Sequence, residues 1–407
     1  MQRFREVGYR ILNSAVGILF FVLCLLFFNM PDELVFTKIV QRIGTRGIYA
    51  LAGCLFVLYL SFKKNIRQDG LLIVSAVFAL FVTVLTYIRS GQTVTAFNNY
   101  VVCGIGALML FSLFFDVNEK KYLWTAFVYY CIIVLIDNAT GIAYSTGSSG
   151  ITWFSHLPSS RMFIFCGNVN LNYIYTAIAF SLGMIVAEKY CRWVWPFNFA
   201  LLGFSLYIAY RTDCLTGMII LSAMIPAAAL ALLANRFRFF EILSKGLNLY
   251  VTTAVNILLA VLAFLASIGK LSLFEGFDIT FHSRAPIWKF AVKAFLENPV
   301  FGNGLQVPIN TEVSYSHVHS LFIEIPYLSG IFGTALFVLI GVLIAYMLGK
   351  VQKKSVKYGL SFMLGLFFTA SLMEFYPVQG MFTLFGAVYY GARTFAVRKR
   401  TERKKDS

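Results

Sequence analysis

Two histidines lie one residue apart where a polar segment of the chain meets a long apolar run. The segment Ser314-Tyr-Ser-His-Val-His-Ser-Leu-Phe-Ile-Glu-Ile325 contains His317 and His319, and the whole chain has only 4 histidines. Such a pair could chelate a metal together with His282, form a structural pair hydrogen-bonded to its loop, or supply a general acid or base that titrates near neutrality. The chain has no DxD or HExxH motif, so the acid or base interpretation is favoured over the metal.

Glu324 lies in the apolar run five residues after His319. An ionised carboxylate is expensive there, and five residues of separation on a helix point the two side chains in different directions. We expect Glu324 either to orient a histidine or an acceptor hydroxyl, or to be a protonated packing residue. Glu374, further along the chain, admits the same two interpretations.

A short amphipathic helix is predicted before the histidine pair, at about residues 286–297. Lys289, Lys293 and Glu297 recur every four residues and form one polar stripe, whereas apolar side chains that include Trp288 cover most of the rest. This pattern is typical of a helix that lies in a membrane interface with its polar stripe toward water. Such a helix is either purely structural or a support for the residues at its two ends.

The residues that flank this helix define its limits. Asn298-Pro299 should end it, and Gly302 and Gly304 allow a tight turn directly afterward. Arg284 lies at the start of the helix and the histidine pair follows its end, so these are the residues that the helix would position.

Arg211 is a second candidate cation. It lies in Tyr210-Arg-Thr-Asp213, between two apolar runs with almost no loop around it. A charge at a membrane edge is costly without a partner, so Arg211 is a functional candidate, a snorkelling anchor or one half of an ion pair with Asp213. Because the planar guanidinium binds phosphate through paired hydrogen bonds, Arg211 and Arg284 on one membrane face would suit a lipid-linked diphosphate.

The composition is that of a polytopic membrane protein. Of the 407 residues, 59% are hydrophobic and 13% are charged, and the mean hydropathy is +0.76. Because a membrane helix needs about 20 mostly apolar residues, the sequence predicts an all-α fold of one integral-membrane domain, residues 1–407, with about twelve spans. The predicted spans are roughly 9–29, 46–62, 70–88, 96–115, 121–137, 169–187, 194–210, 213–234, 248–269, 319–348, 358–376 and 378–396.

Basic residues determine the predicted orientation. With the N-terminus inside, every predicted inside loop carries Lys or Arg, as expected of cytoplasmic loops, and the C-terminus is inside as well. Two long outer loops are then predicted, at about 137–168 and 270–318, the second of them between spans nine and ten. The net charge of +16 is therefore mainly a topology signal, and we expect no nucleic-acid partner. The 7 cysteines have no paired spacing, so neither a disulfide framework nor a zinc site is supported.

Several of these motifs together resemble the O-antigen ligase and O-antigen polymerase superfamily. The family pattern has an arginine and an aromatic residue in a large outer loop, a Pro-x-x-Gly-x-Gly turn, and a His-Asn pair that heads the next span with Gly-x-x-Gly below it. The corresponding residues here are Ser283-Arg284-x-x-x-Trp288, Asn298-Pro299-x-x-Gly302-x-Gly304, His317-x-His319-Ser320-x-x-x-Glu324 and Gly330-x-x-Gly333. Ser320 departs from the pattern, because Asn usually follows the histidine, and this leaves the hydrogen-bond partner of the histidine undefined.

The resemblance implies an inverting glycosyltransferase in the membrane that takes a glycan from undecaprenyl diphosphate, without a nucleotide sugar, a metal or another cofactor. Arg211, which matches an arginine that the family often carries at the outer end of a span, would hold the diphosphate together with Arg284. His319 would activate or orient the acceptor hydroxyl. The expected substrate-binding residues around them are His282, Trp288, Lys289, His317 and Glu324.

Two reactions share this layout. A polymerase, which is the favoured alternative, uses another lipid-linked repeat unit as acceptor, whereas a ligase uses a different acceptor such as lipid A core or a wall polymer. The resemblance implies polysaccharide or capsule synthesis at a bacterial cytoplasmic membrane, with an extracytoplasmic site and with membrane lipid, a flippase and a chain-length regulator as partners. The rival class is a flippase or another transporter, since about twelve spans also suit it, but the internal repeat common in transporters is not visible.

Overall fold

The structure, a computed structural model, describes residues 2–29, 38–63, 66–89, 93–145, 163–164, 167–168, 172–212, 214–246, 253–258, 261, 265, 281–305, 318–372 and 378–396. The first helices are α1 (Gln2–Leu12), α2 (Ala15–Phe28), α4 (Lys38–Phe62), the 3-10 turn η1 (Ile66–Gln68), α5 (Gly70–Arg89), α6 (Thr93–Ala96), the π-helix η2 (Phe97–Ile105) and α7 (Gly106–Ser145). The later ones are α8 (Asn172–Lys189), α9 (Val194–Arg211), α10 (Leu215–Ala234), α11 (Arg238–Gly246), α13 (Phe281–Glu297), α14 (Leu321–Gly349), α15 (Lys354–Ala370) and α16 (Val378–Arg393). Two short antiparallel strands, β1 (Phe163–Ile164) and β2 (Gly167–Asn168), complete the described part.

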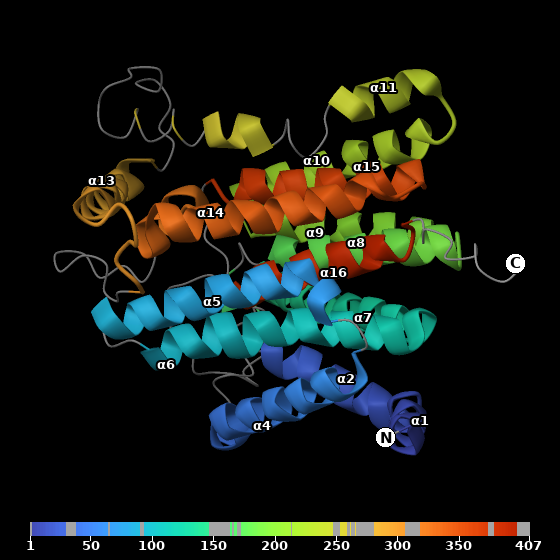
Figure 1. Cartoon of the computed structure of the whole chain (residues 1–407). Coiled ribbons are helices and arrows are strands. Elements are labelled where there is room, and N and C mark those ends of the chain that lie inside the picture. Colours follow the sequence, from blue (N-terminus) through green and yellow to red (C-terminus); the bar gives the residue numbers. More distant parts are fainter. Residues whose placement is uncertain are drawn as a thin grey trace, which may run out of the picture.

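The long helices run between two ends of one bundle, which we call the α13 end and the α1 end after the helices found there (Figure 1). α5 connects the two. It begins directly after Asp69, which lines a cavity together with Tyr9 of α1. At its other terminus, the Nη2 atom of Arg89 donates to Oδ1 of Asn298, just after α13, at 2.9 Å. Arg393 at the end of α16 lines the same cavity as Tyr9, so both termini of the described chain lie at the α1 end.

The core of the bundle is formed by α8 and α16. Every residue of α8 from Asn172 to Ala187 is buried, and so is every residue of α16 from Val378 to Ala392 except Gln379. Both sequences are rich in apolar and small residues all round, which is the pattern of a helix enclosed by other helices. α14, which packs against α16, and α5, which packs against α14, present apolar side chains outward as well as inward.

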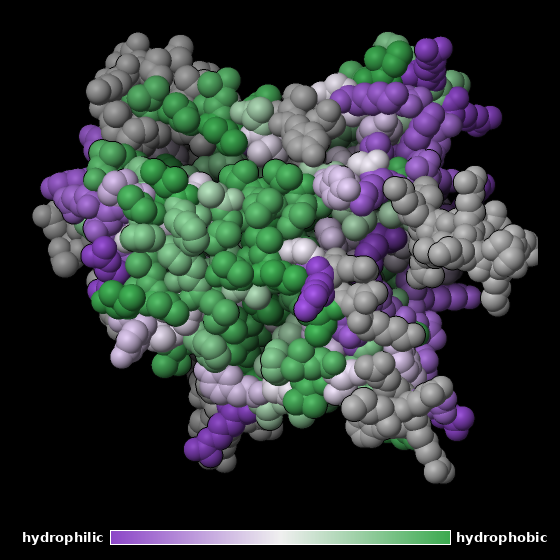
Figure 2. Space-filling view, viewed as in Figure 1, coloured by the Kyte–Doolittle hydropathy of each residue, from purple (hydrophilic) through white to green (hydrophobic). Residues whose placement is uncertain are grey.

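A broad apolar surface covers the middle of the bundle, while hydrophilic side chains gather toward its two ends (Figure 2). The exposed apolar residues of the described chain include Val77 and Leu80 of α5 and Val338 and Val342 of α14. A soluble protein rarely exposes a continuous apolar surface of this kind, whereas a lipid-facing belt requires one.

Four helical segments of the described chain are long and apolar enough to cross a membrane: Gly70–Arg89, Thr93–Ile142, Leu215–Ala234 and Leu321–Gly349. A fifth span results if Glu6–Leu12 and Ala15–Phe28, which meet at 64°, are counted as one broken span. These segments indicate a multi-pass membrane protein. The number of twelve spans and their orientation stay predictions, and most of the ninth predicted span, 248–269, lies outside the described residues.

One boundary agrees with the sequence-based prediction and one differs from it. Asn118 is a non-helical residue within α7, with φ of −155° and ψ of 87°, and it breaks the helix between the fourth and fifth predicted spans, 96–115 and 121–137. α13, which the sequence predicts to be an interfacial helix, begins at Phe281, five residues before the predicted start, so Pro286 lies inside the helix rather than in its first turn. A proline there removes one backbone hydrogen bond, but a helix can continue past it when its buried face is well packed, as it is here.

Candidate functional site

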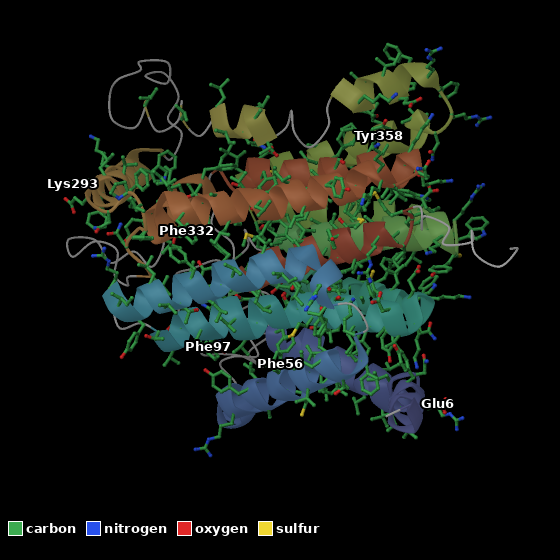
Figure 3. All side chains as sticks on the ribbon, viewed as in Figure 1. Glu6, Phe56, Phe97, Lys293, Phe332 and Tyr358 are labelled. Atoms are coloured by element: carbon green, nitrogen blue, oxygen red, sulfur yellow. The ribbon has the colours of Figure 1, made fainter. Side chains whose placement is uncertain are left out.

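α13 packs one face against α14 and leaves its lysines exposed. Ile287, Trp288 and Ala291 are buried in this contact, whereas Lys289 and Lys293 are exposed, and Lys293 projects from the outer side of the helix (Figure 3). The predicted polar stripe is therefore confirmed. The apolar face packs mainly on protein, because Trp288 lies against the start of α14.

The backbone of Val318 is held from both sides. The indole Nε1 of Trp288 donates to the carbonyl oxygen of Val318 at 3.0 Å. The N–H of Val318 donates to Oε2 of Glu324, which lies one turn into α14, at 2.5 Å. This arrangement resembles a capping box, in which a side chain in the first turns of a helix bonds back to the backbone that enters it. Glu324 therefore binds the loop rather than pointing freely into a substrate cavity.

His319 follows directly and adopts a left-handed backbone conformation with φ of 59°, and it is the only non-glycine residue with positive φ in the described chain. This conformation costs a non-glycine residue about 1–2 kcal/mol. The hydrogen bonds at Val318 each contribute about 1 kcal/mol or more when buried, so they can hold it. On the other side of His319, Ser320 is the N-cap of α14, and the N–H of Leu321 donates to the carbonyl of Ser371 at 2.9 Å. The half-buried imidazole is thus carried by a backbone that is fixed before and after it.

The turn after α13 docks into a break in α14. α14 bends at Gly330, where φ is 60° and ψ is −164°. In an unbroken helix, the N–H groups of Ile331 and Phe332 would donate to the carbonyls of Tyr327 and Leu328. These four groups bond to the turn instead, through Ile331 N to Pro299 O at 2.8 Å, Phe332 N to Val300 O at 3.1 Å, Asn303 N to Tyr327 O at 3.0 Å and Gly304 N to Leu328 O at 2.9 Å.

Glycines make this close approach possible. Gly302 and Gly304 have φ values of 82° and 69°, which confirms the predicted tight turn. A Cβ atom on Gly302 would lie 2.5 Å from the backbone nitrogen of Gly330, and one on Gly330 would overlap the carbonyl oxygen of Val300. Asn303 adds a side-chain bond, because its Nδ2 donates to the carbonyl of Ala294 at 3.0 Å. The turn, α13 and α14 therefore form one rigid support for His319.

The structure describes the candidate arginines and the two other candidate histidines less completely than it describes His319. Arg284 and His282 belong to the first turn of α13, but the structure describes only their backbone, and His317 lies outside the described residues. Arg211 is the last residue of α9, is exposed, and donates from Nη1 to the hydroxyl of Tyr207 at 3.1 Å. Asp213, with which Arg211 would form an ion pair in one of the alternatives, also lies outside the described part.

Arg211 nevertheless lies at the α13 end of the bundle. Trp195, near the start of α9, donates to Oε1 of Glu188 at 3.2 Å, next to Lys189 in the cavity at the α1 end. The 18 residues of α9 then extend about 27 Å, so the helix ends at the opposite side of the bundle. The structure thus brings Trp288, Glu324 and His319 together and places Arg211 and Arg284 at the same end of the molecule.

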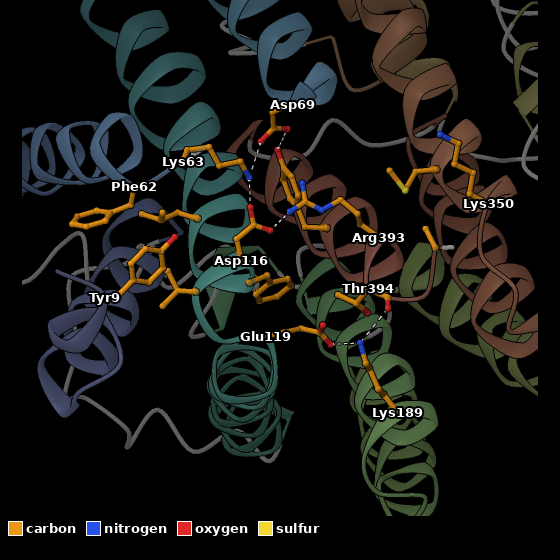
Figure 4. Close-up of a pocket in the computed structure, with 16 residues that line it drawn as sticks. Tyr9, Phe62, Lys63, Asp69, Asp116, Glu119, Lys189, Lys350, Arg393 and Thr394 are labelled. Carbon is orange, nitrogen blue, oxygen red and sulfur yellow. Dashed lines mark hydrogen bonds and ion pairs between the residues drawn. The ribbon is translucent and has the colours of Figure 1, made fainter. Parts of the chain in front are cut away.

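A second cluster of functional groups was not predicted from the sequence. A cavity of about 1080 Å³ opens at the α1 end and is lined by Lys63, Lys189, Lys350 and Arg393 together with Asp69, Asp116 and Glu119 (Figure 4). Most of these charges neutralise one another. Lys63 Nζ lies 2.7 Å from Asp116 Oδ2 and 3.6 Å from Asp69 Oδ2, Arg393 pairs with Asp116, and Lys189 pairs with Glu119.

Asp69 is the centre of this network. Its carboxylate accepts hydrogen bonds from Tyr59 at 3.1 Å, from Tyr390 at 2.6 Å and from Ser112. These residues come from α4, α16 and α7, which are far apart in the chain, so no local sequence motif could predict the cluster. Because its charges are paired and its acids hydrogen-bonded, we interpret it as a structural network that ties the helices together.

A metal site is not formed by the residues that the structure describes. Among them, no three His, Cys, Asp or Glu side chains come close enough to hold a metal ion. The predicted alternative that uses His282, His317 and His319 lies largely outside the described side chains, so it stays a prediction.

Comparison with known proteins gives one family match. Residues 197–338 match the family model described as O-Antigen ligase. The matched segment covers about a third of the chain and contains α13, the docked turn, His319, Glu324 and the break in α14. A search of curated proteins found no match to the chain.

Proposed function

We propose that the protein transfers a glycan from undecaprenyl diphosphate to the hydroxyl group of an acceptor sugar, since residues 197–338 match the family model described as O-Antigen ligase. The observation that carries this proposal is the strained and anchored His319, which the matched segment contains. Backbone strain of this kind is concentrated at functional sites, where surrounding bonds over-determine one conformation. A neutral imidazole has a ring nitrogen that can act as a general base, so it can take a proton from an acceptor hydroxyl.

The reaction is a single displacement at the anomeric carbon of the donor. The acceptor oxygen forms the new glycosidic bond while the bond between the anomeric carbon and the diphosphate oxygen breaks, which inverts the configuration. The proton of the acceptor passes to His319. Arg211 and Arg284 bind the diphosphate and stabilise the negative charge that develops on its leaving oxygen, without a metal ion.

The α13 end would face the extracytoplasmic side. Lys63, Lys189, Lys350 and Arg393 line the cavity at the opposite, α1 end, and an excess of Lys and Arg is typical of cytoplasmic segments. The exposed lysines of α13 would then lie at the outer headgroup layer, where an undecaprenyl-linked donor presents its diphosphate.

The favoured acceptor is a second lipid-linked repeat unit, which makes the protein a polymerase of a bacterial surface polysaccharide. The family description favours a second candidate, a ligase that transfers the glycan to a different acceptor such as lipid A core or a wall polymer. The two reactions use the same donor chemistry and differ only in the group that supplies the hydroxyl.

The test uses purified protein, an undecaprenyl-diphosphate-linked oligosaccharide and EDTA. We expect the wild type to form a ladder of longer lipid-linked glycans, and Arg284→Ala and His319→Ala to lose it. Lys293→Ala is the matched control, because this lysine is exposed on the same helix and has no proposed role. Transfer only to an added acceptor would identify a ligase. Absence of transfer to every acceptor by folded wild-type protein would refute the proposed function.

A further inference from the structure

We propose that Glu324 and Trp288 are positioning residues that fix the direction of the His319 imidazole by clamping the preceding residue, and that neither of them contacts the substrate. The family resemblance implied that both bind substrate, and the sequence also left Glu324 open as a residue that orients a histidine. The geometry favours the orienting role for both residues and shows that they would act through Val318. This inference rests on the proposed function, because it takes His319 as the group that activates the acceptor hydroxyl.

The two side chains act on one residue from opposite directions. Trp288 donates to the carbonyl of Val318 at 3.0 Å, and Glu324 accepts from the N–H of Val318 at 2.5 Å. Trp288 belongs to α13 and Glu324 to α14, so the position of Val318 depends on the packing of both helices. A residue with both backbone groups bonded can rotate little about its own dihedral angles.

Burial separates the clamp from the group that it positions. Val318 is 0% exposed, and Trp288 and Glu324 are each 1% exposed, whereas His319 between Val318 and α14 is half-buried. A substrate that enters from outside can therefore reach only the exposed part of His319, whose Nδ1 atom is buried, whereas Glu324 and Trp288 are enclosed by the protein.

The backbone angle of His319 explains why a clamp is needed. A φ of 59° directs the bond from Cα to Cβ differently from the negative φ that histidine ordinarily adopts. If Val318 were released, the chain could relax to negative φ and the imidazole would move relative to the donor and the acceptor. A displacement of about 1 Å at a reacting group can lower a rate about 100-fold.

The rival interpretation makes Glu324 a proton-transfer group that touches the acceptor. The two interpretations differ for Glu324→Gln. A glutamine side chain keeps a carbonyl oxygen that accepts from the Val318 N–H, but it cannot act as a base. The clamp therefore predicts that Gln restores function where Ala does not.

The experiment measures steady-state transfer by purified Glu324→Ala, Glu324→Gln and Trp288→Phe proteins with the lipid-linked oligosaccharide as donor. We expect Glu324→Ala to lower kcat about 100-fold with little change in KM, and Glu324→Gln to recover most of the rate with the wild-type pH profile. Trp288→Phe removes only the Nε1 donor and should also lower kcat. The double variant with Trp288→Phe and Glu324→Ala should lose less kcat than the product of the two single fold-losses, because both substitutions release the same residue, Val318.

Three results would overturn the inference. Equal inactivity of Glu324→Gln and Glu324→Ala, with one limb of the pH profile lost, would make Glu324 a proton-transfer group. A change confined to KM would make it a substrate-binding residue. Wild-type kcat in Glu324→Ala would mean that the clamp has no effect on the reaction.

Amide hydrogen exchange separates failure of this inference from failure of the proposed function. The peptide that contains Val318 should be protected in the wild type and in Glu324→Gln, and should exchange faster in Glu324→Ala. If the wild type transfers no glycan, the proposed function fails, yet this pattern still tests the clamp. Equal protection in all three proteins would refute the clamp itself.

Discussion

The docking of the turn after α13 into the break of α14 can be tested with a pair of glycine substitutions in one helix. Gly330→Ala places a methyl group against the carbonyl of Val300 at a φ of 60°. Gly341→Ala is the matched control, because a Cβ atom there would meet no other atom within 4 Å. Both changes add one methyl group to α14, so only the docked geometry distinguishes them.

The expected loss of unfolding free energy can be worked out for the two ways in which the protein can accommodate Gly330→Ala. If α14 stays broken, the alanine costs about 1–2 kcal/mol for its left-handed conformation, and the overlap with Val300 adds to this. If α14 straightens, two helical hydrogen bonds replace four bonds to the turn, and the net loss of two bonds costs about 2 kcal/mol at about 1 kcal/mol each. We therefore expect Gly330→Ala to lower the free energy of unfolding by about 2–4 kcal/mol.

Thermal unfolding of the purified proteins in detergent provides the measurement. Gly341→Ala should leave the melting temperature unchanged or raise it, because alanine in a helix interior is favoured over glycine by about 0.5–1 kcal/mol. Gly330→Ala should lower it by several degrees and should also reduce glycan transfer, since His319 loses its support. Equal melting temperatures for the two variants would refute the reasoning, because the docked turn would then contribute nothing to stability.

Three further predictions concern the α1 end and the orientation. Asp69→Ala should destabilise the protein by about 3 kcal/mol, measured by thermal unfolding, because it removes one partner of the buried Lys63. The hydrogen bond from Lys354 lowers the pKa of Glu241 below its ordinary value, so Glu241 should stabilise the fold above pH 4.5 and lose this effect as the pH falls through its lowered pKa. The melting temperatures of wild type and Glu241→Gln should therefore converge at acid pH. Finally, a membrane-impermeant maleimide applied to cells with a permeabilised outer layer should label Lys293→Cys but not Lys354→Cys.

Each of these predictions has a contradicting outcome. An unchanged melting temperature in Asp69→Ala would mean that the ion pair with Asp116 alone is enough to stabilise the buried Lys63. If the melting temperatures of wild type and Glu241→Gln differed by the same amount at every pH, the ion pair of Glu241 would not be the cause of the difference. In the labelling experiment, the wild type measures the background from the natural cysteines, and preferential labelling of Lys354→Cys would reverse the proposed orientation.

Local features of the site could be read from the sequence. Asn298-Pro299 ends α13 as predicted, and Gly302 and Gly304 form the predicted turn, because both effects depend on backbone preferences of the residues themselves. The exposed lysine stripe of α13 was also predictable, since helical periodicity alone determines which residues share a face.

Features that depend on distant partners could not be predicted. Gly330 lies in an apolar run that reads as one continuous span, and its break exists because residues 299–304 supply the missing bonds. The network around Asp69 joins α4, α7 and α16, whose spacing in the sequence carries no signal. The role of Glu324 depends on Val318, a residue whose side chain gave no reason to single it out.

The hydrogen-bond exchange at the break of α14 also bears on how the protein enters the membrane. Lipid supplies no partner for backbone N–H and C=O groups, so a segment inserted alone must satisfy its own. Before the turn docks, α14 can do this only as a continuous helix through Gly330. We therefore expect α14 to insert straight and to bend later, when residues 299–304 arrive at Tyr327 and Leu328. The site around His319 would then be completed only after insertion, so a precursor with an undocked turn would span the bilayer with an incomplete site.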